Sequence, residues 1–217
     1  MPDNARAVEH WLSLREELLR LGFYQTSLTN FERASFRERP ERYRYEECSF
    51  RPNRYNVAGF GPSATSYSAT QNFQHGIKTM NPTASVDYLA AVKTGKRVWN
   101  KMFVYRPLDQ FVFWLTRRLA DLYIDRGVSR KLFSIDPAID FAEEFAAMAD
   151  AELVEITAEA IRPTPKGMFY ADSIAALFAS RAIRVNRDLG SAVIGGDVPK
   201  ELLHDTREND ARPHGMG

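Results

Sequence analysis

The sequence predicts an α+β fold in which a short αβ unit, an irregular middle region and a helical domain follow one another. Apolar residues recur at helical spacing over 5–21, Gly22 suits the position after a helix, and 23–28 follows as a strand. Three later helices each begin with a proline in the first turn, where its missing N–H costs nothing: Pro107, Pro137 and Pro165. Between the last two helices, 153–157 and 160–162 can pair as a small hairpin.

The first helix owes its amphipathic character to large apolar residues spaced three or four apart. They are Val8, Trp11, Leu12, Leu14, Leu18, Leu19 and Leu21. A helix, a glycine and a strand in this order form the repeating unit of an α/β barrel. A single unit cannot bury both faces of its strand, so we expect this one to need a partner surface or to rearrange.

Residues 32–55 form an irregular stretch in which seven arginines alternate with five aromatic residues and five glutamates. Arginine holds carboxylates through two parallel hydrogen bonds and stacks on aromatic rings. One interpretation is a loop that meets an acidic aromatic ligand, such as a porphyrin with its propionates. Single-stranded nucleic acid is a second interpretation, and a solvated arm of Arg–Glu pairs is a third.

The middle of the chain is dominated by a glycine motif that begins at Asn56 and contains Gly59 and Gly61. Glycines let the backbone turn tightly or lie close to a ligand. The polar stretch 69–82 is predicted to be a loop, 85–94 a short helix that ends at Gly95, and 98–105 an extended segment.

The remaining segments predict a helical domain. An apolar stripe from Leu108 to Leu122 gives a long helix that Gly127 closes, and Asp136 can cap the next helix. Thr164 caps a last helix that runs to about Ile183. Three helices with a hairpin suggest a winged-helix-like module. The predicted domains are residues 1–105, 106–184 and a disordered tail over 185–217.

The amino-acid composition excludes several classes of function for this protein. A net charge of +1 gives no general attraction to nucleic acid, and the helix after Pro137 carries acidic residues that would repel phosphate. The single cysteine suits a reducing compartment, and neither a secretory signal nor a membrane-spanning run is present in the sequence. We therefore expect a cytoplasmic protein that does not bind a membrane and does not read nucleic acid.

Four segments in order resemble one known family over roughly residues 10–180: 22–31, 56–66, 87–95 and 161–167. They are similar to the C-terminal half of the radical-SAM family of oxygen-independent coproporphyrinogen III oxidase, which also includes haem-handling and methyl-transferring relatives. The resemblance implies an α+β fold, with a terminal αβ fragment of a radical-SAM barrel followed by a helical, winged-helix-like C-terminal domain. In the intact family enzyme it implies S-adenosyl-L-methionine (SAM) and an iron–sulfur cluster as cofactors.

The resemblance also implies a site. The residues that would line the SAM and substrate cavity are Tyr24, Gln25, Ser27, Asn30, Gly59, Gly61, Ser63, Ala64 and Thr65. Both glycines can alternatively serve only a tight turn. Arg42, Arg44 and Arg54 are the expected contacts to porphyrin carboxylates.

The family's CxxxCxxC cluster motif is absent, because Cys48 is the only cysteine. The four histidines are scattered, so no metal site is predicted. We therefore expect the C-terminal portion of a radical-SAM enzyme that is inactive alone. It would become an oxidoreductase or a methyltransferase only when a cluster-bearing barrel is supplied, by a longer reading frame or by a separate subunit. A non-enzymatic haem- or porphyrin-binding protein and a winged-helix adaptor are the alternatives.

Overall fold

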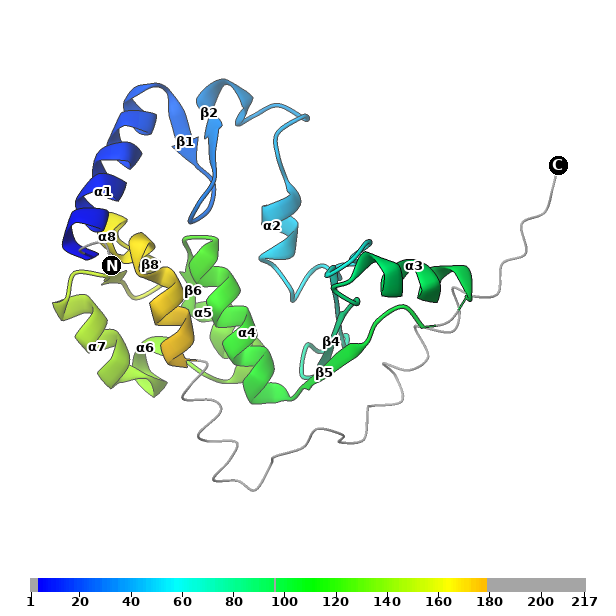
Figure 1. The fold of residues 1–217 in the computed structure, drawn as a ribbon. Coiled ribbons are helices and arrows are strands. Elements are labelled where there is room, and N and C mark those ends of the chain that lie inside the picture. Colours follow the sequence, from blue (N-terminus) through cyan, green and yellow to red (C-terminus); the bar gives the residue numbers. More distant parts are fainter. Residues whose placement is uncertain (1–3, 96, 179–217) are drawn as a thin grey trace. The chain divides into compact units, whose positions relative to one another are not determined.

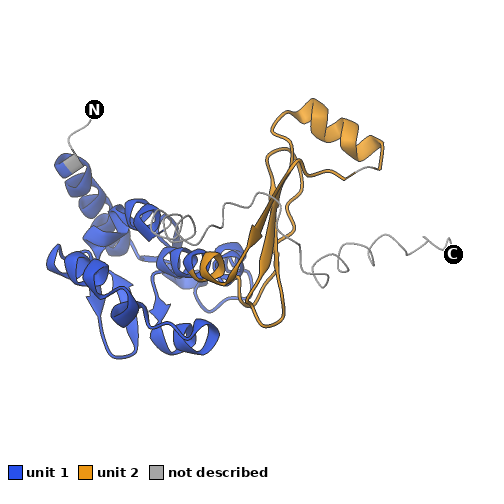
Figure 2. Cartoon of the chain, turned by 90° about the horizontal axis from the view of Figure 1, so that it is seen from below, with its two compact units in different colours: residues 1–51, 112–184 blue, residues 52–111, 185–217 orange. Residues whose placement is uncertain are grey.

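The computed structural model describes residues 4–95 and 97–178. The chain divides into two compact units, coloured separately in Figure 2: unit 1 comprises Met1–Arg51 and Val112–Arg184, and unit 2 comprises Pro52–Phe111 and Val185–Gly217. Unit 1 therefore combines the first helix with the helical domain, whereas the sequence predicted a boundary near residue 105. The predicted disordered tail, 185–217, lies outside the described residues.

Unit 1 begins with the predicted αβ unit (Figure 1). The helix is α1 (Asn4–Arg20) and the strand is β1 (Phe23–Gln25). Three elements that were not predicted follow them: β2 (Phe31–Arg33), the 3₁₀ turn η1 (Ala34–Phe36) and α2 (Tyr45–Ser49). The predicted helix is confirmed, and Gly22 follows it with φ of +80°. The strand is shorter than predicted, because the backbone N–H groups of Thr26 and Ser27 turn back onto the carbonyl of Asn30. β1 and β2 pair antiparallel, with Tyr24 opposite Glu32.

The rest of unit 1 is mainly helical. Its elements are α4 (Pro107–Ala120), which belongs to this unit from Val112, then β6 (Ile124–Asp125), α5 (Arg126–Phe133), α6 (Pro137–Asp140), α7 (Ala142–Asp150), β7 (Val154–Ile156), β8 (Ala160–Pro163) and α8 (Pro165–Phe169). Residues 171–178 are again helical. The three strands form an antiparallel sheet in the order β6-β8-β7.

The end predicted for α4 is wrong. The apolar stripe predicted that the helix from Pro107 would continue to Gly127, but α4 ends at Ala120. Leu122 adopts a left-handed backbone with φ of +61°, and Ile124 pairs with Ile161 in the sheet. Pairing with a distant strand therefore overrides the local helical pattern.

The helix caps and the hairpin predicted for this domain are confirmed, but the single helix predicted from Pro137 is divided into α6 and α7 at Phe141. The Asp136 side chain accepts a hydrogen bond from the N–H of Ala138, and that of Thr164 accepts one from the N–H of Gly167. β7 and β8 form the predicted hairpin. The last helix is interrupted near Tyr170, and the part predicted beyond residue 178 lies outside the described residues. The winged-helix assignment stays a prediction.

The core of unit 1 lies among α4, α7, the three-stranded sheet and the helix over 171–178. Its buried side chains include Trp114, Leu115, Leu119, Ile124, Phe145, Met148, Val154, Ile161, Ile174 and Phe178. Trp114 packs against Phe133 with ring centroids 5.7 Å apart, and Phe145 packs against Phe178 at 5.3 Å. Within the described part of the chain, no helix is both long and apolar enough to cross a membrane.

Unit 2 is built on an antiparallel sheet of β3 (Thr65–Ala69), β4 (Gly76–Met80) and β5 (Lys101–Tyr105), with α3 (Ser85–Lys93) between the last two strands in sequence. The helix and the extended segment were predicted, but the loop predicted over 69–82 is wrong because it contains the central strand. Because the segment is mostly polar, the sequence did not indicate this strand, which is paired with a neighbouring strand on both edges. The turn between β3 and β4 buries Phe73, and the buried Tyr67 hydroxyl donates a 2.6 Å hydrogen bond to Gln110.

Candidate functional site

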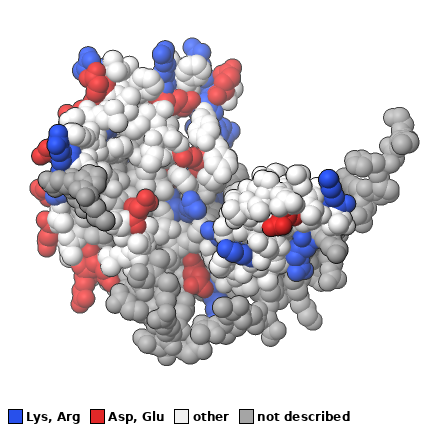
Figure 3. All heavy atoms as spheres, viewed as in Figure 1, with Lys and Arg blue, Asp and Glu red and all other residues white. Residues whose placement is uncertain are grey.

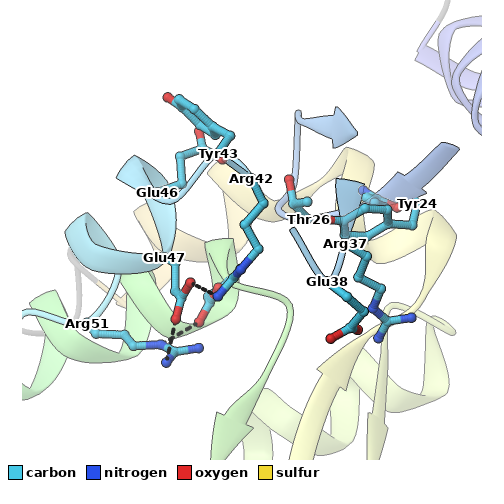
Figure 4. A pocket seen from close by; sticks show the side chains of 11 residues that line it. Tyr24, Thr26, Arg37, Glu38, Arg42, Tyr43, Glu46, Glu47 and Arg51 are labelled. Atoms are coloured by element: carbon cyan, nitrogen blue, oxygen red, sulfur yellow. Dashed lines mark hydrogen bonds and ion pairs between the residues drawn. The ribbon is translucent and has the colours of Figure 1, made fainter. Parts of the chain in front are cut away.

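Unit 1 contains a cavity of about 400 Å³ whose walls are mostly polar (Figure 4). Its lining residues come from the end of β1, the segment after η1, α2 and the residue that follows α4: Tyr24, Gln25, Thr26, Arg37, Glu38, Arg42, Tyr43, Glu46, Glu47, Arg51 and Asp121. The N–H of Leu28 donates to the carbonyl of Ala120, 3.1 Å away, and this bond holds the β1 turn beside the end of α4.

One wall of the cavity is formed by β1. The Tyr24 hydroxyl donates a 2.5 Å hydrogen bond to Glu32, and Arg15 donates a 2.8 Å bond to the Gln25 side-chain oxygen. Burial raises the pKa of Tyr24, and the hydrogen bond to the Glu32 carboxylate raises it further. The Arg37 guanidinium lies over the Tyr24 ring, 5.5 Å from its centroid, so this wall is both aromatic and cationic.

The opposite wall, which Figure 4 shows with dashed interactions, centres on Glu47 of α2. Its carboxylate binds Arg42 at 2.7 Å, Arg51 at 3.4 Å and Arg44 at 3.5 Å. Burial acts to raise the pKa of Glu47, but the three guanidinium groups outweigh it and hold this pKa below its usual range.

Asp121 extends this ionic network to the end of α4. Its carboxylate binds Arg118 and lies 3.5 Å from Arg51. Burial raises the pKa of Asp121 against the opposing effect of both arginines. A ligand in this cavity would thus meet carboxylates and guanidinium groups, which suits a molecule with several charged groups.

Four of the predicted site residues lie at the β1 end of the cavity. Tyr24 and Gln25 line it, as Figure 4 shows for Tyr24. Ser27 is buried and donates its hydroxyl to Glu46, which itself lines the cavity. Asn30 closes the turn with its backbone carbonyl. Ser27 and Asn30 therefore support the wall from behind.

The other predicted lining residues, Gly59, Gly61, Ser63, Ala64 and Thr65, form a compact loop in unit 2. The Gly59 N–H donates to the Ser66 hydroxyl, and the Gly61 N–H donates to the Tyr88 hydroxyl, both at 3.0 Å. The Asn81 amide donates to the Gly61 carbonyl at 2.9 Å. These hydrogen bonds favour the alternative that the sequence left open, in which the two glycines serve a tight turn.

The three arginines that were predicted to contact porphyrin carboxylates lie in different parts of the structure. Arg42 lines the cavity, Arg44 binds Glu47 from a more exposed position, and Arg54 is an exposed residue of unit 2. Sequence reasoning missed Arg37, Glu47 and Asp121. The spacing of Arg44, Glu47 and Arg51 on one helical face was a usable local signal. No local signal indicated Asp121, because it comes from a distant segment of the chain.

The residues that the structure describes contain no group of three or more His, Cys, Asp and Glu side chains arranged to hold a metal ion. Cys48, half-buried in α2, is a free thiol. An iron–sulfur cluster needs several thiolate ligands, and this chain has one cysteine. The residues present therefore do not fit such a cluster.

No family model matches the sequence, and no curated protein matches it either. Among solved structures, the chain is similar to the coproporphyrinogen III oxidase of Escherichia coli, which is described as a radical-SAM enzyme. The TM-score is 0.57 at 15% sequence identity, and the match covers 83% of this chain and 42% of that one. This likeness shows a related fold. The chain spans less than half the length of the enzyme it matches.

Proposed function

We propose that this chain is the substrate-binding C-terminal part of a radical-SAM enzyme that resembles oxygen-independent coproporphyrinogen III oxidase. The observation that carries the proposal is the structural likeness to the Escherichia coli enzyme over 83% of the chain. The charged cavity of unit 1 supports it, because a porphyrinogen presents several carboxylates around an extended ring system. In this proposal the cavity holds one edge of such a substrate.

The arginines of the cavity differ in their availability to a ligand. Arg42 and Arg51 already bind Glu47, so a ligand carboxylate would have to compete for them. Within the described residues, Arg37 makes no ion pair, and its side chain is exposed over Tyr24. We expect Arg37 to bind the first carboxylate through two parallel hydrogen bonds, while the Tyr24 ring contacts the apolar part of the ligand.

The proposed partner is a cluster-bearing barrel, present in a longer protein or as a separate subunit. Cys48 cannot bind the cluster alone, so the residues of this chain would bind and orient the substrate but would not generate the radical. The predicted roles of Tyr24, Gln25 and the glycine motif in lining a SAM site are part of the same proposal.

A fluorescence titration of the full chain with coproporphyrin III tests the substrate part of the proposal. We expect saturable binding, about tenfold weaker in Arg37→Ala and in wild type titrated with the tetramethyl ester, which lacks free carboxylates. Arg20→Ala is the matched control, because Arg20 pairs only with Glu17 on the outer surface of α1 among described residues.

Two outcomes would overturn the substrate assignment. Equal affinity for the acid and the ester would show that the arginines do not recognise carboxylates. Binding of SAM, with no binding of coproporphyrin III, would assign the cavity to the cofactor instead.

A further inference from the structure

Charge is distributed unevenly along this nearly neutral chain. Residues 52–111 contain seven basic residues and two acidic ones, a net charge of +5. Residues 112–178 contain seven basic residues and eleven acidic ones, a net charge of −4. Opposite net charges on two parts of one chain favour association between those parts of different molecules.

The basic part of the chain carries an exposed apolar helix. None of the residues of α3 is buried, and Val86, Leu89 and Val92 are 72%, 52% and 48% exposed. They are spaced three apart, so they form one stripe on the helix, and Lys93 follows in its last turn. Figure 2 shows α3 at one end of the sheet rather than against its face.

A hydrogen bond holds the helix that carries this stripe. The Tyr88 hydroxyl of α3 accepts the hydrogen bond from the Gly61 N–H, which ties the helix to the glycine motif. In Figure 3 the surface over α3 is mostly uncharged, with an acidic group on it and basic atoms at its edge; α3 carries Asp87 in its first turn and Lys93 in its last. An apolar stripe with basic neighbours is the surface expected for binding an apolar groove with an acidic rim.

The acidic part of the chain contains such a groove. Ala147, Met148, Leu153 and Leu177 form its apolar floor, Glu143 and Glu144 stand at its side, and its volume is about 340 Å³. Figure 3 shows acidic atoms over the region of α7, which provides most of these residues. The groove has room for aliphatic side chains of a helix, and its two glutamates are opposite in sign to Lys93 at the end of α3 and to the net charge of residues 52–111.

We propose that α3 of one molecule docks into this α7 groove of a second copy of the chain. The inference goes beyond the proposed function and does not depend on it. Because the two surfaces differ, the contact is head-to-tail, and further copies can add until a ring closes. The apolar stripe supplies the buried area, and the charges set the orientation of the two molecules.

Sedimentation velocity of the full chain over about 1–100 µM tests this proposal. We expect the average mass of the wild type to rise with concentration, and to fall again at about 1 M salt, where charge attraction is screened. Leu89→Glu should reduce the association at least about tenfold, because its carboxylate would face Glu143 and Glu144. Glu143→Lys, which alters the other surface, should weaken association as well.

Leu14→Glu is the matched control, since Leu14 is a 57% exposed leucine on α1 that belongs to neither surface. A wild type that sediments as a single chain at every concentration would overturn the proposal. Undiminished association of Leu89→Glu or Glu143→Lys would also overturn it. Binding of the stripe to vesicles of phosphatidylserine, without self-association, would assign α3 to an anionic membrane surface instead.

Discussion

Asp136 links α5 to the start of α6 through one carboxylate. It is 5% exposed, binds Arg126 at 2.9 Å and Arg130 at 2.6 Å, and caps α6 through the N–H of Ala138. Burial acts to raise the pKa of Asp136, but the hydrogen bonds from Arg126 and Arg130 outweigh it and lower this pKa. The ionised carboxylate therefore stabilises the folded state.

We predict that Asp136→Asn lowers the free energy of unfolding by about 2 kcal/mol at neutral pH, because the charged hydrogen bonds are lost. The contribution of Asp136 is present above the pKa of an unfolded aspartate, near 4, and disappears as the pH falls through the lower folded-state pKa. The difference from wild type should therefore shrink below about pH 4 in urea unfolding curves.

Glu159→Gln is the control for this prediction, because Glu159 lies exposed in the turn of the β7–β8 hairpin. A difference between Asp136→Asn and wild type that stays constant down to about pH 2 would contradict the ionic explanation.

At the scale of elements, the glycine-motif loop depends on its two glycines for different reasons. A Cβ on Gly59 would lie 2.4 Å from the backbone oxygen of Thr65 at the start of β3. A Cβ on Gly61 would meet nothing within 4 Å, but this residue has φ of +99°. The first glycine permits a close backbone approach, and the second permits a left-handed turn.

We therefore predict that Gly59→Ala destabilises the protein by about 3 kcal/mol or more, because backbone atoms of β3 would have to move. Gly61→Ala should cost only about 1–2 kcal/mol of backbone strain. Chemical unfolding of the two variants tests this order. Equal costs would mean that the approach of Thr65 to Gly59 is not needed for folding.

At the scale of the whole molecule, each unit has its own buried side chains. Phe145 lies at the centre of unit 1, and Phe73 is buried in the β3–β4 turn of unit 2. Stability within a protein is often distributed among such locally cooperative regions. The two residues therefore allow the regions to be perturbed separately.

We predict that Phe145→Ala, at a cost of about 4 kcal/mol, accelerates amide exchange in the β6-β8-β7 sheet while exchange in β3, β4 and β5 changes little. Phe73→Ala should have the converse effect. Hydrogen exchange measured by mass spectrometry distinguishes the two patterns. Loss of protection in both sheets from either substitution would show that the units unfold together.

The sequence predictions were correct where an element depends on residues close in sequence, and wrong where it depends on residues far apart in sequence. α1, α3, the caps at Asp136 and Thr164 and the β7–β8 hairpin arise from neighbouring residues, and they were predicted. The end of α4 and the strand β4 depend on pairing with distant segments, and both were missed. The candidate site divides in the same way, because Tyr24, Gln25 and Arg42 were identified while Asp121 was not.

The sequence by itself determined α1, α3 and the caps at Asp136 and Thr164, the arginine-rich character of residues 32–55 and the lack of cysteines for an iron–sulfur cluster. These properties follow from the types of residues and their spacing, both of which can be read directly from the sequence. Only the tertiary structure decided that Glu47 and Asp121 share Arg51, that Arg37 lies over Tyr24, and that the glycine N–H groups bind Ser66 and Tyr88. These contacts join residues whose separation in space is set by packing of the whole unit.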